Sequence, residues 1–255
     1  MKLLKKIVNN IKYKYPWEQY YKKNKKNIIV PDISIYECLV ASSEFNLNAT
    51  ALNYFNNKTS FKQFLSSIDL CSRALKSQGI REGDVVTICM ANTPEAIISL
   101  YAINKIGAIA NMLHPLSAEE EIKESLNSTN SVMLIAIDLA YSKIKQIINN
   151  TKIYKTIIVS PSNSMPKLLS IGYKLTKGRK IDSPKNSEKF IYWDNFISRG
   201  KHYTDKVLVK RTRNDDALIL HSGGTTGVPK NIVLTNGNIN CIIEPVSYTH
   251  LRAHE

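Results

Sequence analysis

The chain has 255 residues, of which 43% are hydrophobic and 22% are charged, as is ordinary for a globular protein with a sizeable core. Polar or charged residues interrupt every long apolar stretch, so we expect no membrane-spanning helix. Four cysteines without a CxxC pair argue against a zinc site and against a disulfide framework, so we expect reduced thiols and a cytoplasmic location.

The net charge of +14 is unevenly distributed along the chain. Residues 1–26 hold nine lysines and one acidic residue, and residues 161–213 hold thirteen lysines and arginines against four acidic residues. The rest of the chain is slightly acidic. A nucleic-acid enzyme would carry its positive charge along a working groove with aromatic platforms, so we expect no nucleic-acid partner.

Residues 1–30 form a basic N-terminal extension. Its apolar residues recur at helical spacing, with lysines on the other face; they are Leu3, Leu4, Ile7, Val8 and Ile11. We favour a helix whose apolar stripe packs on the body of the protein. The alternative is an interfacial helix that places the segment from Lys2 to Lys14 on anionic lipid, as in a peripherally membrane-associated protein.

The first elements after this extension are a short helix at residues 34–43 and a hairpin or edge strand near residues 51–55. Ser60 and Gln63 then predict a capping box, in which each side chain accepts a hydrogen bond from the backbone N–H of the other residue. Apolar residues at helical spacing continue as far as Gly79, which predicts a long amphipathic helix.

From residue 84 to residue 159, strand and helix patterns alternate. Thr93 and Pro94 mark one helix start, since threonine is a good N-cap and proline suits the first helical position. Ser117 and Glu120 predict a second capping box. The expected strands are residues 84–90, 108–113, 131–137 and 155–159, and the expected helices are residues 93–106, 117–128 and 139–149. Such alternation predicts an α/β fold with a largely parallel sheet covered by helices.

Residues 161–213 break this alternation. They are rich in Ser, Pro, Lys and Gly, and we predict a basic surface excursion with one strand at residues 190–193. We expect its lysines and arginines to be solvated. Contact with a membrane or with an anionic substrate is the alternative.

The most informative stretch is LILHSGGTTGVPKNIVLT, residues 218–235. An apolar run at residues 217–220 predicts a buried strand, and a second run at residues 232–234 leads away from the loop between them. The loop combines glycines, which let the backbone approach a ligand closely, with hydroxyl donors and a lysine. This chemistry suits a polyphosphate, and the candidate residues are Ser222, Gly223, Gly224, Thr225, Thr226, Gly227 and Lys230.

The loop is not a Walker P-loop, which ends in Gly-Lys-Ser/Thr, because Pro229 precedes Lys230 and Asn231 follows it. The nonapeptide SGGTTGVPK resembles the phosphate-loop signature of the adenylate-forming superfamily of AMP-dependent synthetases and ligases. This superfamily includes acyl-CoA synthetases, adenylation domains and luciferases. Every position of residues 222–230 fits the pattern of that family.

The resemblance covers residues 30–160 and 214–243. It is carried by the stretches GIREGDVVTICMANTPEAIISLYAINKIGAIANMLHPL, TSFKQF and VLTNGNIN. It implies the first part of the large N-terminal domain of acyl-CoA synthetases, with a partial AMP-binding (adenylation) domain at residues 31–244. Many relatives have histidine in place of Asn236 and glycine in place of Asn231. Neither of these two differences changes a residue expected to donate a hydrogen bond to phosphate. We therefore expect them to reflect the subtype of the family more than the activity.

The resemblance implies an ATP-dependent, AMP-forming acid–thiol ligase. A carboxylate, from a fatty acid or another organic acid, attacks the α-phosphate of ATP bound with Mg²⁺, and a thiol, most often coenzyme A, then takes the acyl group. In this scheme residues 222–230 hold the β- and γ-phosphates, Thr225 and Thr226 donate hydrogen bonds, and Lys230 balances charge. The alternatives are an adenylation domain that loads a carrier protein, and a non-catalytic nucleotide- or membrane-binding module.

Later parts of the family's sequence are not found here. The adenine- and ribose-binding segments and the small C-terminal domain with the adenylation lysine have no counterpart, so we expect an N-terminal fragment that is inactive alone. Residues 245–255, PVSYTHLRAHE, do not resemble the family and look like a translated adaptor or vector tail. We assign no catalytic or metal-binding residue: His114 is expected in a strand-end turn, and Asp215 and Asp216 show no partner pattern for magnesium.

Overall fold

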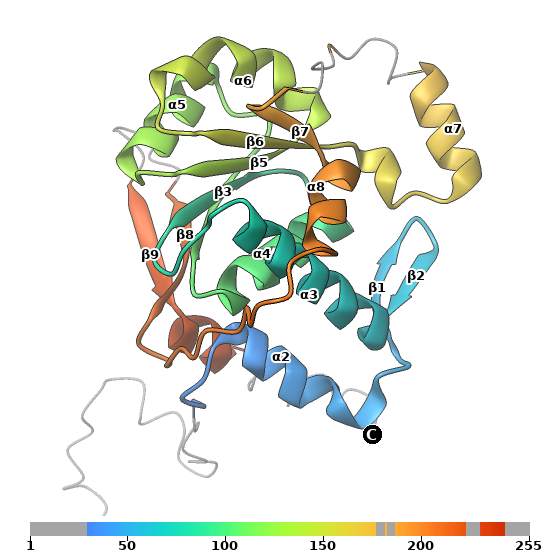
Figure 1. The fold of residues 1–255 in the computed structure, drawn as a ribbon, viewed down its shortest axis with the longest axis vertical. Coiled ribbons are helices and arrows are strands. Elements are labelled where there is room, and N and C mark those ends of the chain that lie inside the picture. Colours follow the sequence, from blue (N-terminus) through green and yellow to red (C-terminus); the bar gives the residue numbers. More distant parts are fainter. Residues whose placement is uncertain (1–29, 177–181, 183–186, 223–229, 243–255) are drawn as a thin grey trace, which may run out of the picture.

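The computed structural model describes residues 30–176, 182, 187–222 and 230–242 (Figure 1). The predicted N-terminal helix between Lys2 and Lys14, the glycine-rich part of the predicted phosphate loop, and residues 245–255 lie outside the described residues. The proposed boundaries at residues 30 and 244 therefore stay predictions.

A seven-stranded sheet forms the centre of the described fold (Figure 1). Its order is β7-β6-β5-β3-β4-β8-β9, and all neighbouring strands run parallel except β8 and β9, which are antiparallel. The strands are β3 (Val85–Cys89), β4 (Ile109–Leu113), β5 (Met133–Ile137), β6 (Lys155–Val159), β7 (Phe190–Tyr192), β8 (Asp216–His221) and β9 (Asn231–Thr235). The predicted α/β fold with a largely parallel sheet is confirmed.

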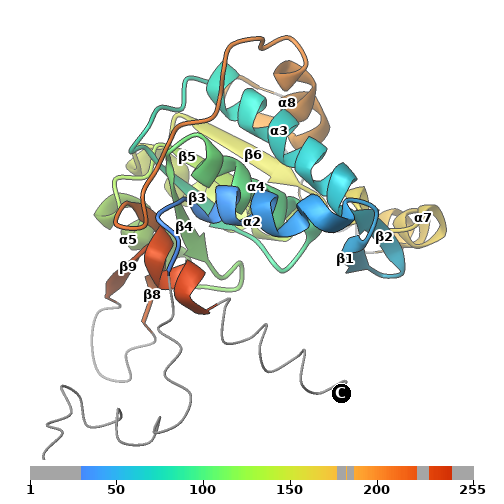
Figure 2. The ribbon, with the colours of Figure 1, turned by 90° about the horizontal axis from the view of Figure 1, so that it is seen from below.

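Helices cover both faces of this sheet. The connection from β3 to β4 and the connection from β4 to β5 run in opposite directions along the sheet. Because such crossovers are right-handed, their helices α4 (Pro94–Lys105) and α5 (Glu119–Ser128) lie on opposite faces (Figure 2). The α4 layer also contains α2 (Ile35–Ser43), α3 (Phe61–Ser77) and α8 (Trp193–Gly200), and α6 (Tyr141–Ile147) packs beside α5. Within the described ranges, no helix is long and apolar enough to cross a membrane.

A small antiparallel hairpin stands outside the main sheet. It consists of β1 (Thr50–Tyr54) and β2 (Asn57–Ser60), which confirms the hairpin expected near residues 51–55. Both ribbon views place it beside α7 (Lys167–Thr176) (Figures 1 and 2). Asn57 Nδ2 donates a hydrogen bond to the backbone oxygen of Ser164 at 3.0 Å, so the hairpin contacts the turn that leads into α7.

Side-chain caps fix where two of the helices begin. Ser60 Oγ accepts from the N–H of Gln63 at 3.3 Å, and Gln63 Oε1 accepts from the N–H of Ser60 at 2.9 Å. The predicted capping box of α3 is therefore confirmed. Thr93 caps α4 by accepting from the N–H of Ala96 at 3.4 Å, and Pro94 occupies the first helical position, also as predicted.

The predicted capping box at the start of α5 is wrong by one residue. The N-cap is Ala118 instead of Ser117, and the N–H of Ala118 donates to Glu121 Oε2 at 3.1 Å. Three successive glutamates follow Ala118, so each of the two registers offers a carboxylate at the required spacing. Sequence spacing alone cannot choose between them.

Residues 161–213 are more regular than the predicted surface excursion. The strand expected at residues 190–193 is present as β7, which extends the sheet beside β6. The segment also forms α7 and α8, two helices that the prediction did not include. Helix α8 belongs to the core: Phe196 is fully buried, and Gly200 lies against the backbone of α3.

Candidate functional site

The predicted phosphate loop is closed at its base by two hydrogen bonds. The N–H of Ser222 donates to the backbone oxygen of Lys230 at 3.0 Å, and the N–H of Lys230 donates to Ser222 Oγ at 3.1 Å. His221 and Asn231 are paired immediately below, as the last register pair of the β8–β9 hairpin. The two ends of the predicted loop are thus brought together. Its remaining predicted residues, Gly223, Gly224, Thr225, Thr226 and Gly227, lie outside the described residues.

A cleft of about 950 Å³ adjoins this loop base. Its lining includes Leu113 and His114 at the end of β4, Ser125 and Ser128 from α5, and His221 and Ser222 at the end of β8. The parallel strands β4 and β8 both end here with their carboxyl termini. Ligands of open α/β sheets bind outside the carboxyl ends of the strands, so the cleft lies where the fold favours binding.

A buried polar network lies behind the cleft. Asn111, in β4, is fully buried, and its Nδ2 lies 2.9 Å from Thr87 Oγ1 and 3.1 Å from Ser125 Oγ. The two amide hydrogens of Asn111 are therefore donated to hydroxyl oxygens, and its Oδ1 is left to accept a hydrogen bond. His221 Nε2 lies 2.7 Å from that Oδ1, so Nε2 is the donor and carries the proton. The same nitrogen lies 3.0 Å from Ser125 Oγ.

His221 is the residue of this site that sequence reasoning missed. Burial lowers the pKa of His221 below its ordinary value of 6.5, and a hydrogen bond with Asn231 acts in the opposite direction. In the sequence, the one feature that could have pointed to His221 is its position as the last residue of the strand that leads into the loop. Its partners Asn111 and Ser125 are far away in the sequence, so only the fold brings them together.

The second strand of the hairpin also contacts α5. Asn231 Nδ2 donates to Ser128 Oγ at 3.1 Å. Since His221 contacts Ser125 one turn earlier on the same helix, both ends of the predicted loop are fixed to α5. The departure from glycine at residue 231 thus has a structural consequence, because glycine would lack this side-chain contact.

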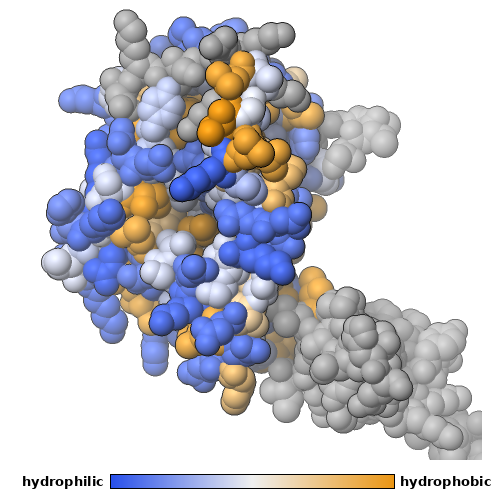
Figure 3. Space-filling view, turned by 90° about the vertical axis from the view of Figure 1, so that its right-hand side faces the viewer, coloured by the Kyte–Doolittle hydropathy of each residue, from blue (hydrophilic) through white to orange (hydrophobic). Residues whose placement is uncertain are grey.

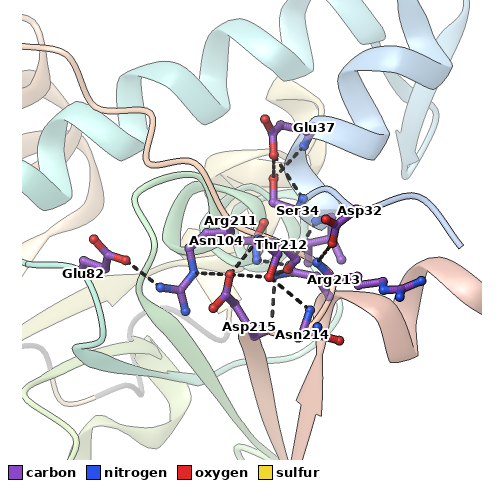
Figure 4. A network of polar contacts seen from close by, with 12 residues as sticks. Asp32, Ser34, Glu37, Glu82, Asn104, Arg211, Thr212, Arg213, Asn214 and Asp215 are labelled. Carbon is purple, nitrogen blue, oxygen red and sulfur yellow. Dashed lines mark hydrogen bonds and ion pairs between the residues drawn. The ribbon is translucent and has the colours of Figure 1, made fainter.

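The opposite end of the hairpin is held by a second polar network (Figure 4). Asp215 accepts from the N–H of Thr212 at 2.6 Å and from Thr212 Oγ1 at 3.0 Å, and the resulting hydrogen bonds lower the pKa of Asp215. Arg211 lies between Asp215 and Glu82, at 2.7 Å from the Glu82 carboxylate. Asp215 therefore stabilises a turn, which accounts for it without a metal.

His114 also has a local structural role. Its Nδ1 accepts from the N–H of Leu116 at 3.2 Å, which fits the strand-end turn expected from the sequence. Among the described residues, no cluster of three or more His, Cys, Asp or Glu side chains could hold a metal ion. The side chains at the loop base are the hydroxyl of Ser222 and the lysine Lys230, which suit an anionic ligand.

Comparison with known proteins shows the family of this chain. A family model described as "AMP-binding enzyme" matches residues 40–253. The chain belongs to this family. Within the AMP-binding enzyme family, the chain is similar to acyl-CoA ligases and synthetases, as the sequence resemblance predicted.

Two curated relatives show how low the sequence identity is and how much of each relative the chain covers. The long-chain-fatty-acid–CoA ligase of Bacillus subtilis (strain 168) is 25% identical over 228 residues, which cover 88% of this chain and 40% of the relative. Acetyl-coenzyme A synthetase 2 of Saccharomyces cerevisiae is 26% identical over 208 residues, which cover 79% of this chain and 29% of the relative. The chain thus spans less than half the length of these relatives.

Solved structures show the same fold. The anthranilate CoA ligase AuaEII in complex with anthranoyl-AMP matches with a TM-score of 0.66 and 20% identity, over 82% of this chain and 36% of that one. A long-chain-fatty-acid-CoA ligase, FadD1, from Archaeoglobus fulgidus matches with a TM-score of 0.64 and 19% identity, over 83% and 38%. The sheet described above therefore corresponds to part of the larger domain of CoA ligases.

Proposed function

We propose that this chain is the ATP-phosphate-binding part of an AMP-forming carboxylate–CoA ligase that acts on a fatty acid or another organic acid. The observation that carries the proposal is the closed base of the loop at residues 222–230. There Ser222 and Lys230 are hydrogen-bonded to each other at the carboxyl end of β8, beside the cleft.

The chemistry of the loop supports phosphate as the ligand. Its sequence supplies successive backbone N–H groups, hydroxyl groups and one lysine between two fixed ends. Backbone amides in such glycine-rich turns bind anions, and a lysine ammonium is a point charge suited to phosphate. We propose that Thr225, Thr226 and Lys230 hold the β- and γ-phosphates. Mg²⁺ would bind the phosphate oxygens of ATP, and Mg²⁺ and coenzyme A would be held mostly by residues of family segments that this chain does not include.

The first test of this proposal is nucleotide binding by the chain itself. MgATP should raise the melting temperature of the wild type, because a ligand that binds only the folded state stabilises it. Lys230→Ala and Thr226→Ala should each remove most of this shift. Lys62→Ala is a matched control, since Lys62 is an exposed lysine on α3. An equal shift in the wild type and in both loop variants would refute the role of the loop.

The second test concerns the reaction and its acceptor. In a protein that contains this chain together with the remaining family segments, ATP–pyrophosphate exchange should depend on an added carboxylic acid, and Thr226→Ala should weaken it. Exchange with long-chain fatty acids but not with acetate would define the substrate class. Acyl transfer to coenzyme A would support the proposal, and transfer only to a carrier protein would favour an adenylation domain instead.

A further inference from the structure

Helix α7 carries an apolar face that points away from the protein. Leu168 is 82% exposed, Leu169 48%, and Ile171 and Leu175 56% each. The half-buried residues of this helix are Ser170 and Tyr173, on its opposite side. Surface helices of globular proteins normally turn their apolar stripe toward the core. This helix has the reverse orientation, so its apolar face is available to something outside the described fold.

The neighbouring hairpin also exposes an apolar side chain. Phe55, at the tip between β1 and β2, is 55% exposed and has a φ of 51°, which is uncommon for a bulky residue. The hairpin and the start of α7 are joined by the Asn57–Ser164 hydrogen bond. Figure 3 faces this side of the molecule and shows apolar side chains gathered in its upper part, where α7 lies. We name the exposed side chains of Phe55, Leu168, Leu169, Ile171 and Leu175 the α7 surface.

Exposed lysines accompany the α7 surface, while the carboxylate of Asp138 lies on the half-buried side of α7, beside Tyr173. Lys58 in the hairpin and Lys167 at the start of α7 are both exposed. The sequence from residue 161 to residue 180 contains five lysines and arginines and no acidic residue. An occupant of this surface must therefore be compatible with apolar contact in the middle and positive charge at the edges.

We propose that the α7 surface docks onto an anionic lipid bilayer. An amphipathic helix with Leu and Ile on one face and lysines at its flanks lies in the interface, with its apolar residues among the acyl chains and its lysines near anionic headgroups. A protein partner fits less well, because four of the five residues of the α7 surface are leucine or isoleucine, whereas the cores of protein interfaces are enriched in aromatic residues, methionine and arginine. This site is separate from the segment between Lys2 and Lys14, and it does not depend on nucleotide binding.

Vesicle co-sedimentation of the full chain tests the proposal. The wild type should bind vesicles of equal parts phosphatidylcholine and phosphatidylglycerol, and should bind pure phosphatidylcholine much more weakly. The combined Leu168→Ser, Ile171→Ser and Leu175→Ser variant should bind the anionic vesicles at least about tenfold more weakly. Lys167→Glu should weaken binding on the order of tenfold, since each charge near the surface contributes separately. Leu116→Ser, at a residue that is 76% exposed elsewhere, should change nothing.

Three results would overturn the proposal. One is binding by the triple variant that equals wild-type binding. Another is binding that disappears only when the lysines between Lys2 and Lys14 are neutralised, which would assign the contact to the N-terminal extension. The third is a wild-type chain that ignores vesicles but forms a dimer that the triple variant dissociates, which would make a second copy the occupant. MgATP-dependent stabilisation should be the same in all these variants, so failure here is distinguishable from failure of the proposed function.

Discussion

Asn236 offers the sharpest quantitative test of how the hairpin is held. Its side chain is completely buried and makes four hydrogen bonds. Oδ1 accepts from the N–H of Ile35 at 3.1 Å and from Asn104 Nδ2 at 2.8 Å. Nδ2 donates to the backbone oxygens of Thr212 at 3.0 Å and Asp215 at 3.2 Å. One amide thus joins the start of α2, the end of α4 and the turn before β8.

The substitution Asn236→Ala should be unusually destabilising. The substitution leaves two N–H donors without their acceptor and two backbone oxygens without their donor. Each buried group left without a hydrogen bond costs about 1–3 kcal/mol. Since a carbonyl oxygen is less demanding than an N–H group, we expect a loss of roughly 4 kcal/mol in the free energy of unfolding. An average point mutation costs about 1 kcal/mol, and a whole domain has only about 5–15 kcal/mol.

Urea unfolding followed by circular dichroism measures this loss. Asn53→Ala serves as the control, because Asn53 is exposed in β1 and should change stability by less than about 0.5 kcal/mol. A loss below about 1 kcal/mol for Asn236→Ala would refute the reasoning, since it would mean that water or rearrangement replaces all four hydrogen bonds.

Two further predictions concern α8 and His221. A Cβ at Gly200 would meet the Leu70 oxygen and would lie 2.9 Å from the Ala74 nitrogen. Gly200→Ala should therefore reduce the free energy of unfolding by about 1–3 kcal/mol and lower the melting temperature. Gly172→Ala, with open space around it in α7, should leave it unchanged or raise it. Burial holds the pKa of His221 below 6.5 in the folded state, so below that pH the unfolded chain takes up the proton first. Wild-type stability should therefore fall as the pH drops below about 6.5, and His221→Gln should flatten this part of a melting profile measured against pH; an identical profile would contradict the assignment.

The parts of the fold that sequence predicted best depend on local patterns. The strand expected at residues 155–159 is β6 (Lys155–Val159), because a short apolar run next to polar residues has few alternatives inside an α/β fold. The Ser60–Gln63 box and the Thr93–Pro94 start were also predictable. In these cases the residues that cap the helix are also those that carry the signal.

The parts that sequence could not predict depend on contacts between distant segments. Helix α8 is only eight residues long, and it is held by the packing of Phe196 and Gly200 against α3. Helix α7 has its apolar face outward, so its periodicity cannot show which side meets the protein. His221 gained its role from partners 96 and 110 residues away in the sequence. For the candidate site, the structure brings together the two ends of the predicted loop, but the sequence did not predict the side chains that hold these ends.

Two polar networks hold the β8–β9 hairpin, one at each of its two ends. At the carboxyl end of β8, His221 and Asn231 contact α5. At the other end, Asn236 contacts α4 and the turn before β8. Six residues of strand at about 3.3 Å each separate these ends by roughly 17–20 Å, which exceeds the range over which substitutions usually couple. We therefore expect the Asn236 network to contribute mainly to the stability of the hairpin. We expect the network around His221 to orient the loop base toward the cleft, so substitutions there test the proposed phosphate recognition with a smaller effect on the fold.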